Sequence, residues 1–234
     1  MHDIYIYMNF ETYKRDGEYH YINVNYPGLV CIHKDPNIFV VHDFLTNSEC
    51  DTIIDTMKDK EMINAFISGG RQDLDYRKCL TKTIFKSSPE FPYFKDFREK
   101  VRSLTDVQEN QLEVTNLTRY TGDENYFKRH KDAYDYGSGY RNGYTTHEVF
   151  NRVVTVIVYL NDVDSGGETR FNDINLDVKP KKGMALIFFP GLLPTSKKNP
   201  GHPADNTMHE ALPPRGEEKW ILQQWVWSGP YLRG

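Results

Sequence analysis

The stretch VVTVIVYL at residues 153–160 decides the fold. β-Branched residues dominate it and turn-forming residues bound it, so the stretch predicts a buried strand rather than a helix. Three more runs are strand-like, at residues 112–120, 184–189 and 220–227. Clusters of Gly, Pro, Asn and Asp separate these runs without intervening helices. This order favours an antiparallel sandwich or barrel over a doubly wound parallel sheet.

The first half of the chain has a different pattern. Thr46 with Glu49 three residues later fits a capping box and predicts a helix over about 47–59. An apolar stripe predicts a second helix near 94–104, and short strands are expected at 29–33 and 38–42. We therefore expect an α+β protein in which helices of the first half support a β-sandwich in the second.

The expected organisation is one domain after a polar segment. Residues 1–27 are polar and Tyr-rich, and an irregular or loosely packed lead-in is predicted there. Residues 28–234 form the single domain, with helical support over about 28–110 and the sheet core over about 111–230. No internal repeat or low-complexity linker divides it.

Composition excludes several classes of protein. The chain has 234 residues, a net charge of −4 and 14% aromatic residues, which is too aromatic for a disordered chain. The slightly acidic balance without basic blocks gives no support to nucleic-acid binding. No run approaches the length of a membrane span, and no signal peptide is visible. The compartment stays unassigned, although three scattered Cys weakly favour a reducing one such as the cytoplasm.

Three residues form a candidate metal site. His130 and Asp132 are two apart, so on a strand both side chains point to the same face. Alone this pair is weak evidence, but His209 follows 77 residues after Asp132. Two His and one carboxylate match the facial triad of non-haem Fe(II) oxygenases. The Cys and His patterns typical of zinc sites are missing. Lys219 could neutralise a dicarboxylate cosubstrate, although a surface Lys is the alternative.

The ordered set of motifs resembles one family of enzymes. The segment YLNDVDSGGETRF at 159–171 is similar to a segment of the prolyl 4-hydroxylases, which are 2-oxoglutarate- and Fe(II)-dependent dioxygenases. The pattern Val-x-Pro-x-x-Gly-x-Ala-Leu-x-Phe at 178–188 resembles another. Asp-x-x-x-His at 205–209 and Lys-Trp at 219–220 follow at the family's spacing, and residues 44–50 resemble its N-terminal helix entry. The resemblance spans about 38–228.

The resemblance implies a double-stranded β-helix, or jelly-roll, core and a role for each matching residue. It implies Fe(II) ligands at His130, Asp132 and His209, and contacts to 2-oxoglutarate from Lys219, Tyr120 and Thr169. It also implies a catalytic Arg152 near the substrate, for which a structural salt bridge is the alternative. Substrate contacts are expected from Tyr126, Tyr134, Tyr140 and Trp227.

This sequence departs from the family pattern in three places. Tyr120 lies one residue further from His130 than expected, and Phe127 competes with Tyr126 for the aligned place. Trp227 stands where prolyl hydroxylases often have His. The Tyr-rich stretch 133–150 is long for a connection between strands, and either a substrate lid or a surface loop would account for it.

The expected function is hydroxylation of a peptidyl residue, first of all proline to 4-hydroxyproline, with release of succinate and CO2. Fe(II), 2-oxoglutarate and ascorbate as reductant are the implied cofactors, and the implied partner is a proline-containing peptide or protein. Two alternatives stay open. One is the same chemistry on another residue or a small molecule, and the other is a non-catalytic jelly-roll that binds peptide.

Overall fold

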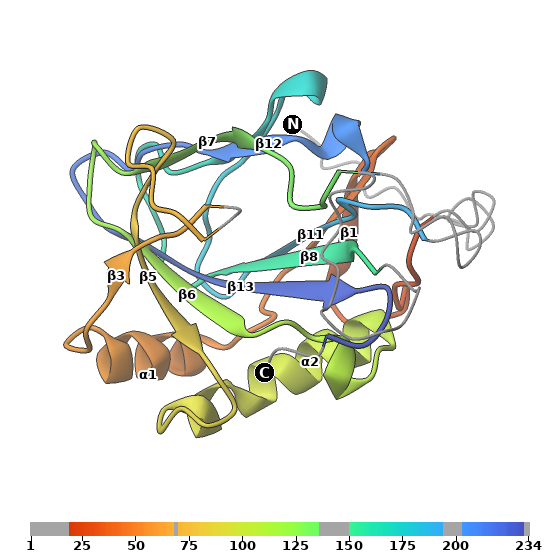
Figure 1. Ribbon diagram of the computed structural model, residues 1–234, viewed down its shortest axis with the longest axis horizontal. Helices are drawn as coiled ribbons and strands as arrows, with labels where there is room; N and C mark the ends of the chain where they lie inside the picture. Colours follow the sequence, from red (N-terminus) through yellow and green to blue (C-terminus); the bar gives the residue numbers. More distant parts are fainter. Residues whose placement is uncertain (1–18, 68–69, 136–149, 194–202, 232–234) are drawn as a thin grey trace.

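The fold is built from two antiparallel sheets that face each other, as seen in a computed structural model (Figure 1). The structure describes residues 19–67, 70–135, 150–193 and 203–231. The larger sheet has, in spatial order, β1 (Leu29–Lys34), β2 (Asn37–Val41), β11 (Ala185–Phe188), β8 (Arg152–Tyr159), β13 (Lys219–Trp227), β6 (Thr115–Tyr120), β5 (Leu80–Ile84) and β3 (Ile63–Asn64). The smaller sheet has β10 (Leu176–Val178), β9 (Thr169–Phe171), β12 (His209–Ala211), β7 (Tyr126–His130) and β4 (Arg77–Lys78).

Two α-helices lie on the side of the larger sheet that faces away from the smaller one (Figure 1). They are α1 (Asn47–Met57) and α2 (Lys95–Thr105), close to the predicted positions. The predicted capping box is present: Glu49 N donates to Thr46 Oγ1 at 3.2 Å, and Thr46 N donates to Glu49 Oε2 at 2.7 Å. Short 3-10 helices are η2 (Phe91–Phe94), η3 (Glu109–Gln111), η4 (Asn172–Ile174) and η5 (Asp205–Thr207). Within the described ranges, no helix combines the length and apolarity needed to span a membrane.

Strand β8 is buried on both faces, which explains its unbroken apolar sequence. Val154, Val156 and Val158 belong to the hydrophobic cluster that contains residues of both helices. Ile157 and Tyr159 belong to a second cluster, between the two sheets. Because side chains alternate along a strand, every second residue of β8 points into the layer between the sheets.

Both halves of the chain supply strands. β1 and β2 pair at the predicted positions, and β2 continues the sheet by pairing with β11. β5 pairs with β6, and β4 pairs with β7 of the smaller sheet. The described part of the predicted lead-in, residues 19–27, has no helix or strand, and Ile22 within it is fully buried in the same cluster as the helices.

Candidate active site

Three buried side chains converge between the sheets. His130 ends β7 and His209 begins β12, and the two residues are paired directly across these strands. His130 Nε2 lies 3.6 Å from Asp132 Oδ1, and His209 Nε2 lies 3.9 Å from Asp132 Oδ2. The prediction that Asp132 shares a strand with His130 is wrong, because β7 ends at His130 and Asp132 lies in the bend that follows. The two side chains still converge.

Both imidazoles present Nε2 to the carboxylate. His130 Nδ1 lies 2.8 Å from the carbonyl of Lys128, and His209 Nδ1 lies 3.1 Å from the carbonyl of Thr207. A carbonyl oxygen only accepts, so each neutral ring carries its proton on Nδ1 and keeps a lone pair on Nε2. His130 Nε2 is buried and has no hydrogen-bond partner among the described residues. Burial, together with the neighbouring His209, lowers the pKa of His130 to about 3.

The donor set fits a divalent metal. Each of the three residues offers one ligand atom, and these atoms lie within 4.8 Å of one another. Burial alone would raise the pKa of Asp132, but interactions with His209, His130 and Arg152 outweigh burial and hold the pKa below its usual value. An ionised carboxylate and a lone pair from each of two imidazoles are the ligands that Fe(II) and similar ions require.

A buried cation lies in the same layer. Lys219 begins β13 and is 1% exposed, and its Nζ donates to the carbonyl of Gly167 at 2.6 Å. The rings of Tyr120 and Tyr159 lie 5.0 and 5.7 Å from Nζ. Burial lowers the pKa of Lys219 to about 7. In the described part of the chain no carboxylate forms an ion pair with it, so an incoming carboxylate would restore the charge.

Thr169, which is expected to contact 2-oxoglutarate, has a side-chain partner that the sequence did not predict. Thr169 is buried, and the hydroxyl of Tyr159 donates to its Oγ1 at 2.8 Å. Tyr159 lies inside the family-like segment and was given no role there. Its place on the inward face of β8 is the signal that could have found it.

Arg152 forms the structural salt bridge that was the alternative to a catalytic role, and its partner is Glu113, which the sequence did not predict. Its Nε and Nη2 each donate to the carboxylate of Glu113 at 2.8 Å. The indole Nε1 of Trp227 donates to the same carboxylate at 2.8 Å, and the ring of Tyr134 lies 5.9 Å from that of Trp227. Glu113 lies outside every motif, so no sequence signal marked it.

The other aromatic residues expected to contact substrate are Tyr126 and Tyr140, and neither is placed beside the triad by the described structure. The hydroxyl of Tyr126 donates to the carbonyls of Leu74 and Asp75 at 3.3 and 3.4 Å. Phe127, not Tyr126, stacks on His130, with ring centroids 3.5 Å apart. Tyr140 and most of the expected lid lie outside the described residues. Substrate contact by any of these aromatic residues stays a prediction.

Comparisons with known proteins agree with this site. Residues 115–227 match the 2OG-Fe(II) oxygenase superfamily. Prolyl 4-hydroxylase 2 of Arabidopsis thaliana is 25% identical over 82% of this chain and 67% of its own length. The human prolyl 4-hydroxylase subunit alpha-3 is 23% identical over 83% of this chain. This chain spans only 34% of that subunit.

Solved structures share the fold. A collagen prolyl hydroxylase of Paramecium bursaria Chlorella virus-1, in its 2-oxoglutarate complex, superposes with a TM-score of 0.64 and 23% identity, covering 82% of this chain and 96% of its own. A prolyl hydroxylase of Trichoplax adhaerens, solved with a hypoxia-inducible-factor peptide, gives 0.58 and 17%, covering 82% and 83%. These likenesses establish the jelly-roll core. Residues 115–227 thus match the 2OG-Fe(II) oxygenase superfamily, and the chain is similar in sequence and in fold to prolyl 4-hydroxylases.

Proposed function

We propose that this protein hydroxylates proline in a peptide or protein to 4-hydroxyproline. The observation that carries the proposal is the shared location of two features. The triad and Lys219 both border the hydrophobic cluster between the sheets: Phe171 and Phe188 contact the ring of His209, and Tyr120 and Tyr159 lie beside Lys219. A metal and a dicarboxylate held there would lie in the same layer between the sheets.

The protein's own groups have separable tasks. When bound, Fe(II) with 2-oxoglutarate and O2 supplies oxidative decarboxylation to succinate and CO2 and hydroxylation of a C–H bond, with ascorbate as the proposed reductant. His130, Asp132 and His209 hold the metal. Lys219 binds the far carboxylate of 2-oxoglutarate, with Tyr120 and Thr169 beside it. The apolar side chains of the cluster between the sheets would exclude water from these groups.

The substrate is proposed from the relatives, which are named prolyl 4-hydroxylases and include a structure with a bound peptide. Tyr134 and Trp227, whose rings lie near each other beside Arg152, are the proposed peptide contacts. Such rings offer a large apolar area at low entropic cost. We further propose one domain over 28–234, in which the helices support the larger sheet.

The test measures succinate formed from 2-oxoglutarate with Fe(II), with and without proline-rich peptides. We expect peptide-stimulated succinate and, by mass spectrometry, one added oxygen atom on proline. Asp132→Ala is the inactive control, because it removes a metal ligand. Oxygen added to another residue, or no increase in succinate with any peptide, would refute the assignment of proline as the substrate residue.

A further inference from the structure

Glu113 is a buried carboxylate with an unusual number of fixed partners. It is 7% exposed, and its carboxylate accepts hydrogen bonds from two nitrogens of Arg152 and from the indole of Trp227. A bidentate pairing of this kind fixes the orientation of both side chains. Glu113 therefore determines where the guanidinium of Arg152 lies.

Arg152 connects Glu113 to the metal site. Its Nη1, which Glu113 does not use, donates to the backbone carbonyl of Asp132 at 3.2 Å. The guanidinium also lies over the ring of Trp225, 3.7 Å from the ring centroid. With one face against an aromatic ring and the other nitrogens bound to Glu113, Arg152 has little freedom to move. The carbonyl of Asp132 is thereby held at a defined place.

Asp132 needs such support because it lies outside regular structure. It follows the end of β7, so no strand ladder fixes its backbone. Its carboxylate is held separately by Thr155, whose Oγ1 donates to Oδ2 at 2.8 Å. The two contacts act on different parts of Asp132: Thr155 orients the carboxylate, and Arg152 fixes the main chain.

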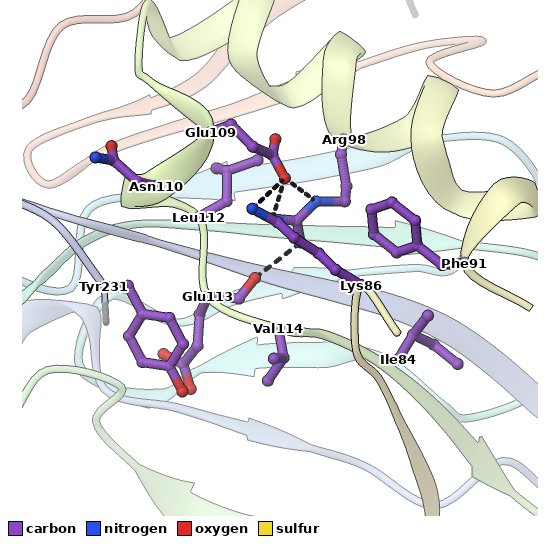
Figure 2. Close-up of a pocket in the computed structure, with 10 residues that line it drawn as sticks. All are labelled: Ile84, Lys86, Phe91, Arg98, Glu109, Asn110, Leu112, Glu113, Val114 and Tyr231. Atoms are coloured by element: carbon purple, nitrogen blue, oxygen red, sulfur yellow. Dashed lines mark hydrogen bonds and ion pairs between the residues drawn. The ribbon is translucent and has the colours of Figure 1, made fainter. Parts of the chain in front are cut away.

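The backbone of Glu113 is itself anchored to the helical side of the sheet. Its carbonyl accepts from Arg98 Nη1 at 2.8 Å and from Gln224 Nε2 at 2.6 Å, and its N–H donates to the carbonyl of Trp225 at 3.0 Å. Figure 2 shows Arg98 reaching the Glu113 backbone across a pocket of about 230 Å³ beside α2. Glu113 thus connects the larger sheet and α2, through Arg152, to Asp132 in the bend after β7.

We propose that Glu113 is a positioning residue for the metal ligand Asp132 and that it acts through Arg152. This inference rests on the assignment of His130, Asp132 and His209 as metal ligands. It gives Arg152 a role toward the metal site that does not depend on substrate. Partners that orient metal ligands commonly change metal affinity by about 10- to 100-fold when they are lost.

The test measures Co²⁺ affinity of the metal-free protein by calorimetry, without substrate or turnover. Glu113→Gln keeps the shape of the side chain but removes its charge, and we expect Co²⁺ to bind about 10- to 100-fold more weakly. Arg152→Met should give a similar loss. The double variant leaves no unpaired buried charge. It should bind Co²⁺ no more weakly than Arg152→Met alone, because both changes remove the same connection from Glu113 through Arg152 to Asp132.

Thr115→Val is the matched control for general loosening. Thr115 is fully buried and forms hydrogen bonds with Arg98 and Gln224 in the same network, but none with Arg152 among the described residues. It should lower the melting temperature and leave Co²⁺ affinity within about twofold of wild type. Wild-type affinity in Glu113→Gln, multiplying losses in the double variant, or an equal loss in Thr115→Val would each overturn the inference. No Co²⁺ binding by the wild-type protein would instead overturn the ligand assignment on which it rests.

Discussion

Binding of 2-oxoglutarate should draw a proton onto Lys219. Burial lowers the pKa of this side chain to about 7, so at pH 8 only about a tenth of the unliganded molecules carry the charge. A carboxylate placed beside the ammonium raises its pKa by about one to three units. The bound state is then about half to fully protonated at pH 8. The expected uptake is about 0.4 to 0.9 proton per 2-oxoglutarate bound, falling to about 0.1 or less at pH 6.

The assay is calorimetric titration of 2-oxoglutarate into Mn²⁺-loaded enzyme, in buffers with different ionisation enthalpies. The dependence of the observed heat on buffer gives the number of protons taken up. Lys219→Arg is the matched control, because its guanidinium stays charged throughout this pH range and should show no uptake. If the wild type takes up no proton at pH 8, or if Lys219→Arg takes up as many, the description of Lys219 as a buried amine with a lowered pKa is wrong.

The same pKa fixes the pH dependence of stability in the ligand-free protein. The folded pKa of Lys219 is lower than the unfolded one, so the unfolded state binds more protons between about pH 7 and 10.5. This group's contribution to the free energy of unfolding should therefore rise with pH across that window, and urea midpoints of wild type relative to Lys219→Met measure it. Asp132→Ala should abolish Co²⁺ binding and turnover, and retained binding by calorimetry would refute its role as a ligand. Thr46→Ala, which breaks the cap of α1, should cost about 1 kcal/mol in urea unfolding without changing Co²⁺ affinity. Gly183→Ala should cost about 1 kcal/mol or more, because Gly183 has φ +78° and an added Cβ would lie 2.2 Å from the carbonyl oxygen of Leu45; an unchanged urea midpoint would contradict this geometry.

Much of the site could be read from sequence because its residue types are rare in the positions they occupy. Two His, one Asp and one Lys in family order led to the buried triad and to Lys219. The helix at 47–57 was found from its cap, since capping is a local property. The strand at 152–159 was found from its β-branched composition.

The residues that were missed act through pairings that only the fold creates. Glu113 and Arg152 are 39 residues apart in sequence, and the sequence near neither residue predicts that they pair. Thr155 and Tyr159 look like ordinary strand residues, and their roles follow from facing inward on β8. Phe127, not Tyr126, lies beside His130 because an irregularity in the pairing of β7 and β12 changes which side chain faces the candidate metal site.

The position of β13 in the larger sheet has a consequence for how the protein folds. This strand lies between β8 and β6, although both precede it by many residues in sequence. Until residues 219–227 join, the strands on its two sides have no shared neighbour and form two separate sheets. Pairing strands at such long sequence separation loses much chain entropy before the stabilising contacts between the strands form, so folding should be slow. Lys219 is the first residue of β13, so a chain in which β13 has not yet paired should lack the proposed carboxylate-binding site.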